Sequence, residues 1–403
     1  MKNMIALVCI KCGAEHEPAP TTYTCKKCGG IMDLKYDYKY VRKHMTKDKL
    51  LCRPLDMWRY TELLPVAEGA PRSRLRTGWS PLYHIPEFAE RLGLGSLYIK
   101  DDGINPTASL KDRASAVAVA KAVETKAEAV ACSSTGNAAS SLAGHSAAIG
   151  MKAFIFVPER APKAKVSQLM VFGANVISVI GSYADTFKLS AEAIEKFGWY
   201  NRNAAINPYL IEGKKTVALE IAEQLGWNSP DYVVVSVGDG CTIAGVWKGF
   251  KDLYEIGMID KLPKIISVQA TGCYPINRAF EENKPLAWMD ENTIADSIAV
   301  GAPRNPDKAL AAIRESCGIA VNVTDDEILS AMKVLGSYGI FGEPAASAGT
   351  AGLIKAAQMK LLPPDAKVVS LVTGSGLKDS ANAIKAAGEP VRIEPRLELL
   401  PSY

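Results

Sequence analysis

A lysine at the start of an expected helix is the residue of this sequence best suited to covalent chemistry. Lys111 lies in the stretch Asn-Pro-Thr-Ala-Ser-Leu-Lys-Asp-Arg at 105–113, after a short apolar run at 97–99 that is typical of a strand. The alanine- and valine-rich run 114–123 predicts a helix with Ser109 as its N-cap. The helix dipole disfavours a cation in the first turn, so the Lys111 amine should lose its proton more easily. A neutral amine can form a Schiff base with a carbonyl cofactor, and a solvated lysine at a helix start is the alternative.

Four cysteines near the N-terminus have the spacing of a metal site. They form two CxxCG units, Cys9 with Cys12 and Cys25 with Cys28. Four thiolates complete a tetrahedral Zn²⁺ shell and leave no open position for chemistry, so the metal would be structural. We therefore expect residues 1–35 to form a small zinc ribbon, against the alternative of a degenerate ribbon that no longer binds metal.

Alternating strand and helix patterns from about residue 96 predict the fold that positions Lys111. Near-continuous apolar strands of this kind are typical of parallel α/β sheets with helices on both faces. We expect an N-terminal arm and the first part of a large domain at 36–128, a small α/β domain at 129–205, and the rest of the large domain at 206–403. The expected strands are residues 97–99, 129–131, 153–157, 176–180, 232–237, 265–268, 320–323 and 368–372.

Three loops at strand ends are candidates for ligand binding, because ligands of such folds bind at the carboxyl ends of the strands. Residues 133–137 offer hydroxyls, an amide and helix N–H groups to a carboxylate or phosphate. Residues 237–242 contain two glycines, which let backbone N–H groups converge on an anion, and Asp239 should point away from it. Residues 373–379 have the same form. Ordinary tight turns are the alternative for the two glycine-rich loops.

Composition excludes several classes of function. A net charge of +4 over 403 residues gives no case for nucleic acid. No apolar run is long enough for a membrane span, and the apolar run near the N-terminus is too short for an export signal. Nine cysteines, an odd number, fit a reducing cytoplasm better than a disulfide framework. We therefore expect a cytoplasmic protein that binds a small molecule.

Five motifs in the same order resemble those of one enzyme family. They are residues 78–82, 105–113, 134–137, 207–216 and 373–379. Together they make the chain similar to threonine synthase and its relatives in the tryptophan synthase β group of pyridoxal-phosphate (PLP) enzymes. The resemblance implies PLP fold type II, with two doubly wound α/β domains. It also implies a lyase that acts on a small amino acid, and relatives of this kind are commonly homodimers.

The resemblance further implies a role for individual residues. Lys111 would hold PLP as a Schiff base and move protons once the substrate displaces it. Asn137 would hydrogen-bond the phenolic oxygen of the cofactor, and Thr373 would face its pyridine nitrogen. A hydroxyl at that nitrogen favours elimination and replacement over transamination. The cofactor phosphate would lie on Gly238, Asp239, Gly240, Cys241 and Thr242, and the substrate carboxylate on Ser134, Thr135 and Gly136.

One segment departs from the family pattern and bears on the choice of substrate. In threonine synthases, by this resemblance, an Asn-Ser pair and an arginine hold the phosphate of O-phosphohomoserine. The aligned residues here are Ala204, Ala205 and Leu210. Their loss would weaken phosphate binding by several kcal/mol, because charge-assisted hydrogen bonds are the strong ones. The cations that the sequence offers as replacements are Lys100, Arg160, Lys163, Lys165 and Arg202.

Three functions therefore stay open. The first is threonine synthase or a near relative, which converts O-phosphohomoserine and water to threonine and phosphate. The second is an ammonia-lyase or β-replacement enzyme for an unphosphorylated or O-phosphoserine-type amino acid, which explains Ala204, Ala205 and Leu210 directly. The third is a binding protein without catalysis, which is disfavoured because the family's lysine, asparagine and threonine are retained.

Glu343 lies between a glycine and a proline at the start of an expected helix. Acidic residues are common at this position because the helix dipole favours them. We interpret Glu343 as a helix-start carboxylate, with a place beside the cofactor ring as the alternative.

Overall fold

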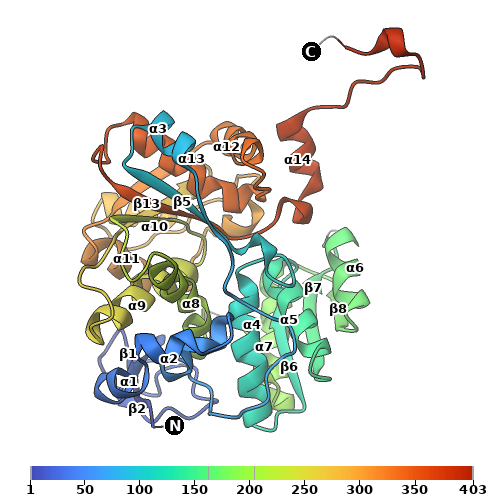
Figure 1. The fold of residues 1–403 in the computed structure, drawn as a ribbon. Coiled ribbons are helices and arrows are strands. Elements are labelled where there is room, and N and C mark those ends of the chain that lie inside the picture. The colour runs from blue at the N-terminus through green and yellow to red at the C-terminus, as the bar shows by residue number, and fades with distance from the viewer. Residues whose placement is uncertain (1, 162, 204, 402–403) are drawn as a thin grey trace.

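The computed structural model describes residues 2–161, 163–203 and 205–401 and arranges them around three sheets (Figure 1). The smallest is the N-terminal ribbon, an antiparallel sheet in the order β2-β1-β3. Its strands are β1 (Met4–Cys9), β2 (Glu15–His16) and β3 (Met32–Tyr36). The short helices α1 (Tyr38–His44) and α2 (Lys47–Leu51) follow it along the chain.

The largest sheet has six strands in the order β12-β11-β10-β13-β5-β4. They are β4 (Leu82–His84), β5 (Ser96–Asp101), β10 (Tyr232–Ser236), β11 (Lys264–Ala270), β12 (Ile319–Val323) and β13 (Lys367–Val372). All neighbours are parallel except β4, which pairs antiparallel with β5. The helices that accompany this sheet are α3 (Pro86–Leu92), α8 (Tyr209–Gln224), α9 (Cys241–Glu255), α10 (Pro275–Glu281), α11 (Pro306–Glu315), α12 (Asp325–Ser337), α13 (Pro344–Gln358) and α14 (Ser380–Ala387).

The third sheet has four parallel strands in the order β8-β7-β6-β9. Its strands are β6 (Ala129–Ser133), β7 (Lys152–Pro158), β8 (Asn175–Val179) and β9 (Tyr200–Asn201), and its helices are α5 (Asn137–Ala147), α6 (Lys163–Val171) and α7 (Tyr183–Phe197). Helix α4 (Lys111–Glu124) packs against both α5 and α8, so it joins this part of the chain to the larger one (Figure 1).

The α/β fold predicted from the strand and helix pattern is confirmed. Every expected strand is present with its ends shifted by a few residues at most. Two features were missed. The edge strand β4 has only three residues, too few for a recognisable pattern. The strand β9 has only two residues and was missed for the same reason.

The prediction that Ser109 caps α4 is wrong. The residue before the helix is Leu110, it makes no side-chain cap, and the Ser109 hydroxyl is buried without a hydrogen-bond partner. The chain reaches α4 through a tight turn instead, in which Ala108 has a φ of +66° and donates its N–H to the carbonyl of Asn105.

Ala108 is therefore strained, and we expect Ala108→Gly to stabilise the protein. The left-handed conformation costs a non-glycine residue about 1–2 kcal/mol. Glycine avoids this cost, but its greater conformational freedom in the unfolded chain cancels about 0.5–1 kcal/mol of the gain. Urea unfolding should show a gain of up to about 1 kcal/mol. The matched control is Ala114→Gly inside α4, which should lose about 1 kcal/mol. Equal losses in both variants would contradict the strain.

A buried ion cluster fixes α4 against α8 and β5. Arg113, two residues after Lys111, pairs with Asp102 through Nε (2.6 Å) and with Glu220 through Nη1 (2.5 Å). Lys100 Nζ lies 2.8 Å from the other oxygen of Glu220. All four side chains are almost fully buried. The cluster therefore sets the position of the first turn of α4.

The N-terminal ribbon is attached to α8 and α9 by a second ion cluster. The Tyr36 hydroxyl donates to Glu212 (2.9 Å), and Lys248 pairs with Asp33 (2.9 Å). Lys215 bridges Glu212 and Asp252 at 2.5 and 2.6 Å. Strand β3 is thus bound to the two helices whose N-terminal ends lie beside Lys111.

Two further features concern the surface. Among the helices that the structure describes, none combines the length and apolar character needed to cross a membrane. The chain after α14 extends away from the rest of the molecule (Figure 1) and exposes Val391, Leu397 and Leu400.

Candidate active site

Lys111 is the first residue of α4 and is held by the loop that follows β13. The backbone N–H of Leu110 donates to the carbonyl of Thr373 (2.9 Å), and Ser109 pairs with Gly374 in an isolated bridge. Strand β5 lies next to β13 in the sheet, so the loops after these two strands meet. The candidate lysine and the candidate ring-nitrogen partner thereby come from adjacent loops.

The environment of Lys111 favours a neutral amine. Burial lowers the pKa of its ammonium, the carboxylate of Glu343 opposes that effect, and the positive charge of Arg202 adds to it. The net direction is downward, as expected for a lysine that acts as a nucleophile.

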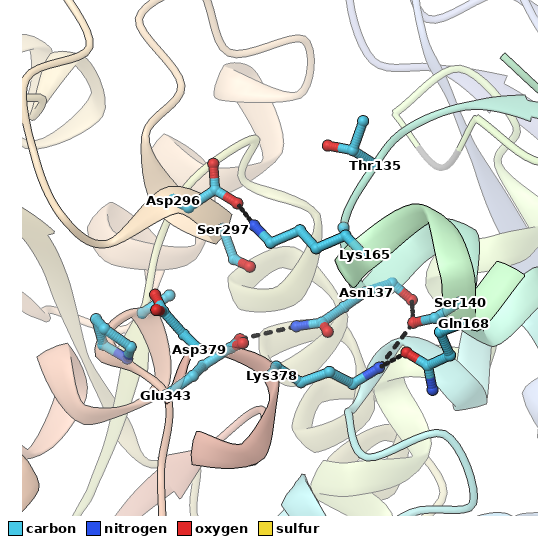
Figure 2. Close-up of a pocket in the computed structure, with 13 residues that line it drawn as sticks. Thr135, Asn137, Ser140, Lys165, Gln168, Asp296, Ser297, Glu343, Lys378 and Asp379 are labelled. Carbon is cyan, nitrogen blue, oxygen red and sulfur yellow. Dashed lines mark hydrogen bonds and ion pairs between the residues drawn. The ribbon is translucent and has the colours of Figure 1, made fainter. Parts of the chain in front are cut away.

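A small cavity of about 30 Å³ lies near this point, lined by residues of the site loops but not by Lys111 itself (Figure 2). One wall is the loop after β6 with the start of α5, where Asn137 donates from Nδ2 to Glu343 Oε1 at 2.8 Å. Lys378 reaches across and donates to Ser140 (2.9 Å) and Gln168 (3.0 Å). The residues that line the cavity are Thr135, Gly136, Asn137, Ser140, Lys165, Gln168, Asp296, Ser297, Glu343, Pro344, Ala345, Lys378 and Asp379.

Our interpretation of Glu343 as a helix-start carboxylate missed its place in the cavity. Glu343 does precede α13, yet its side chain makes no cap to that helix and binds Asn137 instead. It is buried, and burial raises the pKa of its carboxyl while the nearby Lys111 charge lowers it. Because 206 residues separate Glu343 from Asn137, no local sequence pattern connects them.

The loop before α9 has the form of an anion site. Gly240, its last residue, has a φ of +88° and gives α9 no side-chain cap, so the N–H groups of the first turn have no side-chain acceptor. A Cβ at Gly240 would lie 2.5 Å from the carbonyl oxygen of Asn305, which allows only glycine there. Asp239 accepts from the backbone N–H of Arg304 (3.1 Å), so its carboxylate is occupied by that contact. The α9 N-terminus can therefore hold a phosphate.

The loop predicted to bind the substrate carboxylate borders the cavity. Ser134 accepts from the N–H of Gly136 (3.2 Å), and Thr135 and Gly136 line the cavity. Cys241 and Thr242 begin α9, and Cys241 is buried. Burial has the larger effect on the pKa of the Lys111 amine, and Cys241 and Asp239 are close enough to raise that pKa against it, so α4 and the α9 loop begin near each other.

The residues at the family's substrate-phosphate positions are apolar in the structure where it describes them. Leu210 is fully buried in the apolar cluster around α4, β6 and β7, and Ala205 packs against Ile211 and Cys241. Ala204 lies outside the described residues. Lys100 is bound to Glu220, and Lys165 pairs with Asp296 at 2.5 Å, so neither is a free replacement cation.

The four N-terminal cysteines converge. Their sulfur atoms all lie within 4.8 Å of one another, with Cys9–Cys28 at 3.5 Å and Cys12–Cys25 at 3.7 Å. With Zn–S bonds of about 2.3 Å, a tetrahedral site has S···S edges of about 3.8 Å, which these sulfurs match. His16 Nε2 is 3.2 Å from Cys25 Sγ, which places it beside the cluster.

Comparison with known proteins agrees with this geometry. A family model described as "Pyridoxal-phosphate dependent enzyme" matches residues 74–374. The chain belongs to this family of pyridoxal-phosphate dependent enzymes. Threonine synthase of Methanocaldococcus jannaschii is 41% identical over 97% of both chains, and that of Methanosarcina acetivorans is 40% identical over 98% of both. The protein is therefore a threonine synthase-like PLP-dependent lyase.

Solved structures show the same fold at lower identity. Diaminopropionate ammonia lyase from Escherichia coli superposes with a TM-score of 0.66 at 20% identity, over 77% of this chain and 87% of that one. Threonine deaminase isoform 2 from Solanum lycopersicum gives 0.64 at 23% identity, over 76% and 87%. These likenesses place the chain among fold type II PLP enzymes.

The residues present fit PLP. Lys111 supplies a buried amine with a lowered pKa, and the α9 N-terminus supplies N–H groups that no side chain caps. The hydroxyl of Ser109, two residues before the lysine, is buried without a partner. Both ends of the cofactor, the aldehyde and the phosphate, thus have a complementary group.

Proposed function

We propose that the protein is a threonine synthase, which converts O-phosphohomoserine and water to threonine and phosphate. The observation that carries this proposal is the 41% identity to a threonine synthase over 97% of both chains. A match of that length includes the N-terminal ribbon as well as the region that holds Lys111. PLP would supply the electron sink for carbanion chemistry at the substrate.

The residues of the chain would have the following roles in binding and proton transfer. Lys111 would hold the cofactor and carry protons to and from Cα and Cβ of the substrate, since its amine is buried and of lowered pKa. Ser134, Thr135 and Gly136 would bind the substrate carboxylate with a hydroxyl and backbone N–H groups. Asn137 would donate to the phenolic oxygen of the ring, and Thr373 would face the ring nitrogen. Gly238, Asp239, Gly240, Cys241 and Thr242 would surround the cofactor phosphate.

A second candidate is an ammonia-lyase or β-replacement enzyme on an unphosphorylated or O-phosphoserine-type amino acid. The burial of Leu210 in an apolar cluster favours it, because no arginine occupies the family's phosphate position. The two candidates differ in product.

One screen separates the two candidates. The PLP-loaded protein is incubated with O-phosphohomoserine, threonine, serine or O-phosphoserine, and phosphate and keto acid are both measured. Phosphate and threonine from O-phosphohomoserine support threonine synthase. Keto acid from threonine or serine without phosphate release from O-phosphohomoserine rejects it in favour of the second candidate.

We also propose that the four cysteines bind one structural Zn²⁺. Protein purified without added metal should then contain about one equivalent of zinc, and Cys25→Ser should lose it and melt at a temperature several degrees lower. Cys52→Ser is the matched control, because Cys52 is exposed and outside the cluster, and it should keep the metal. Zinc content well below one equivalent in the wild type would refute the site.

Finally, we propose a cytoplasmic homodimer. Free thiols at all the described cysteines are expected in a reducing compartment. The extended segment after α14, with its exposed leucines, offers apolar surface to a second copy. Light scattering on the purified chain measures the assembly, and a monomer at micromolar concentration would contradict it.

A further inference from the structure

Arg202 is a buried cation without an ion-pair partner among the carboxylates of the described residues. It follows β9 and extends that strand's pairing, since its N–H donates to the carbonyl of Ala131 (2.9 Å). Its guanidinium donates to Ser115 Oγ (3.1 Å) and to the carbonyl of Lys111 (3.4 Å). The residue is 2% exposed, and none of the described carboxylates forms an ion pair with it. Arg202 is therefore a buried charge with no direct carboxylate contact, hydrogen-bonded to the first residue of α4, and Asp112 is the carboxylate that acts on it from a greater distance.

Lys214 is a second cation of this kind. It lies on α8, is 4% exposed, and has neither a hydrogen-bond acceptor nor an ion-pair partner within the described part of the chain. A Cβ on Gly245 would lie 3.1 Å from the Cβ of Lys214, and Gly245 is one turn into α9 from Cys241. Burial lowers the pKa of Lys214 to about 8, with Lys111 and Arg202 adding positive charge. Lys111 and Arg202 are therefore both within electrostatic range of Lys214, which packs against the first turns of α9.

The other buried lysines and arginines of the described residues do have carboxylate partners. They are Arg59, Lys100, Arg113, Lys121, Lys215 and Lys248. Burial of an unpaired charge costs several kcal/mol, so a chain rarely keeps one without a use. Arg202 and Lys214 are exceptions to this pattern. Arg202 contacts the candidate lysine, and Lys214 is close enough for the charge of Lys111 to lower its pKa. An anionic ligand would neutralise them.

We propose that Arg202 and Lys214 bind the phosphomonoester of the substrate beside Lys111. The inference rests on the proposed function, in which that substrate is O-phosphohomoserine. The pair flanks the segment that lacks the family's phosphate ligands, because Lys214 lies one helical turn after Leu210 and Arg202 precedes residue 204. The cofactor phosphate has its own donors in the α9 N-terminus. A guanidinium and an ammonium together supply the charge-assisted contacts that a phosphate dianion needs.

Binding of a non-reactive probe to the holoenzyme tests the pair. The probe is the phosphonate analogue of O-phosphohomoserine, in which a methylene replaces the ester oxygen, and norvaline is the same amino acid without the phosphonate. Arg202→Met and Lys214→Met should each weaken binding of the phosphonate at least tenfold, about 1.4 kcal/mol. The visible spectrum of the cofactor reports the binding. Norvaline affinity should change less than twofold. Lys251→Met, an equal charge change at an exposed site of α9, should alter neither.

A stability measurement separates ligand binding from a structural role. Methionine in place of an unpaired buried charge should raise the melting temperature of the protein without substrate, whereas loss of a structural contact would lower it. In the wild type, inorganic phosphate should compete with the phosphonate and not with norvaline. This competition needs no variant, so it tests the inference even if a variant fails to fold.

Three results would overturn the assignment. The first is that the variants weaken the binding of phosphonate and norvaline equally. The second is that they weaken the binding of neither. The third is that inorganic phosphate does not compete with the phosphonate in the wild type. The assignment would also fail if the variants lost affinity for PLP while their affinities for pyridoxal and for the phosphonate stayed unchanged. The pair would then bind the cofactor phosphate.

Phosphate release from O-phosphohomoserine by the wild type tests the proposed function separately. Phosphonate binding that depends on Arg202 and Lys214 without such release supports the anion pair and rejects threonine synthase. Release with an unchanged KM in both variants supports threonine synthase and rejects the pair.

Discussion

Lys111→Ala should abolish the visible absorbance of bound cofactor and reduce turnover by about 10²–10⁴-fold or more, since it removes both the covalent anchor and the proton carrier. The amine is buried at the first residue of α4, and burial lowers its pKa. Neither water nor a neighbouring side chain can replace an amine that must bond to the cofactor. Absorbance of the purified variant and phosphate release from O-phosphohomoserine are the two measurements.

Two controls make the Lys111 result specific. Lys165→Ala removes an amine that lines the nearby cavity and pairs with Asp296, and this variant should keep the visible absorbance. Borohydride reduction of the wild type should leave the cofactor attached to the peptide that contains Lys111. A Lys111→Ala protein that retains the absorbance would show that another lysine holds the cofactor.

The sequence predicted the loops of the site because parallel α/β sheets repeat one local rule. Each buried strand ends in a loop that opens a helix, so the apolar runs predicted at 129–131 and 232–237, observed at 129–133 and 232–236, mark where the candidate site loops begin. Lys111 was proposed in the same way, from the strand before it and the helix after it. These features depend only on residues that are close together in the sequence.

What the sequence missed depends on contacts between distant residues. Glu343 was interpreted as an ordinary helix-start residue, and only the tertiary fold brings the start of α13 to Asn137 at the start of α5. Lys100 was a candidate cation for the substrate phosphate, yet it is bound to Glu220 on α8. Charge alone does not reveal which cations have partners.

Arg202 and Lys214 also show that the sequence does not reveal which buried cations lack a carboxylate partner. Arg202 was one of several cations near the altered segment, and Lys214 was not singled out at all. Their distinction is the absence of a carboxylate partner in the described structure, which appears only when the surroundings of every buried cation are compared. A replaced family residue can therefore be compensated by charges elsewhere in the fold.

Glu220→Gln should destabilise the fold by about 3–5 kcal/mol, the usual cost of breaking a buried ion cluster by removing one charge. Glu220 is the carboxylate shared by Arg113 and Lys100, and all three are buried. The amide keeps the shape of the side chain but leaves two cations with Asp102 as their remaining counter-charge. Urea unfolding of the PLP-loaded protein measures the loss. Glu315→Gln, which breaks an exposed pair with Lys251, should cost at most about 1 kcal/mol.

The pH dependence of stability gives an independent test of the same cluster. Burial alone would raise the pKa of Glu220, but the charges of Arg113 and Lys100 outweigh it and lower the pKa from 4.5 to about 2. Between these values the unfolded chain binds a proton that the folded chain does not, so stability falls as the pH falls from about 4.5 towards 2. Glu220→Gln should lose that part of the slope, because it has no proton to bind. A variant with the wild-type acid profile and a loss below 1 kcal/mol would mean that the cluster contributes no more than an exposed pair.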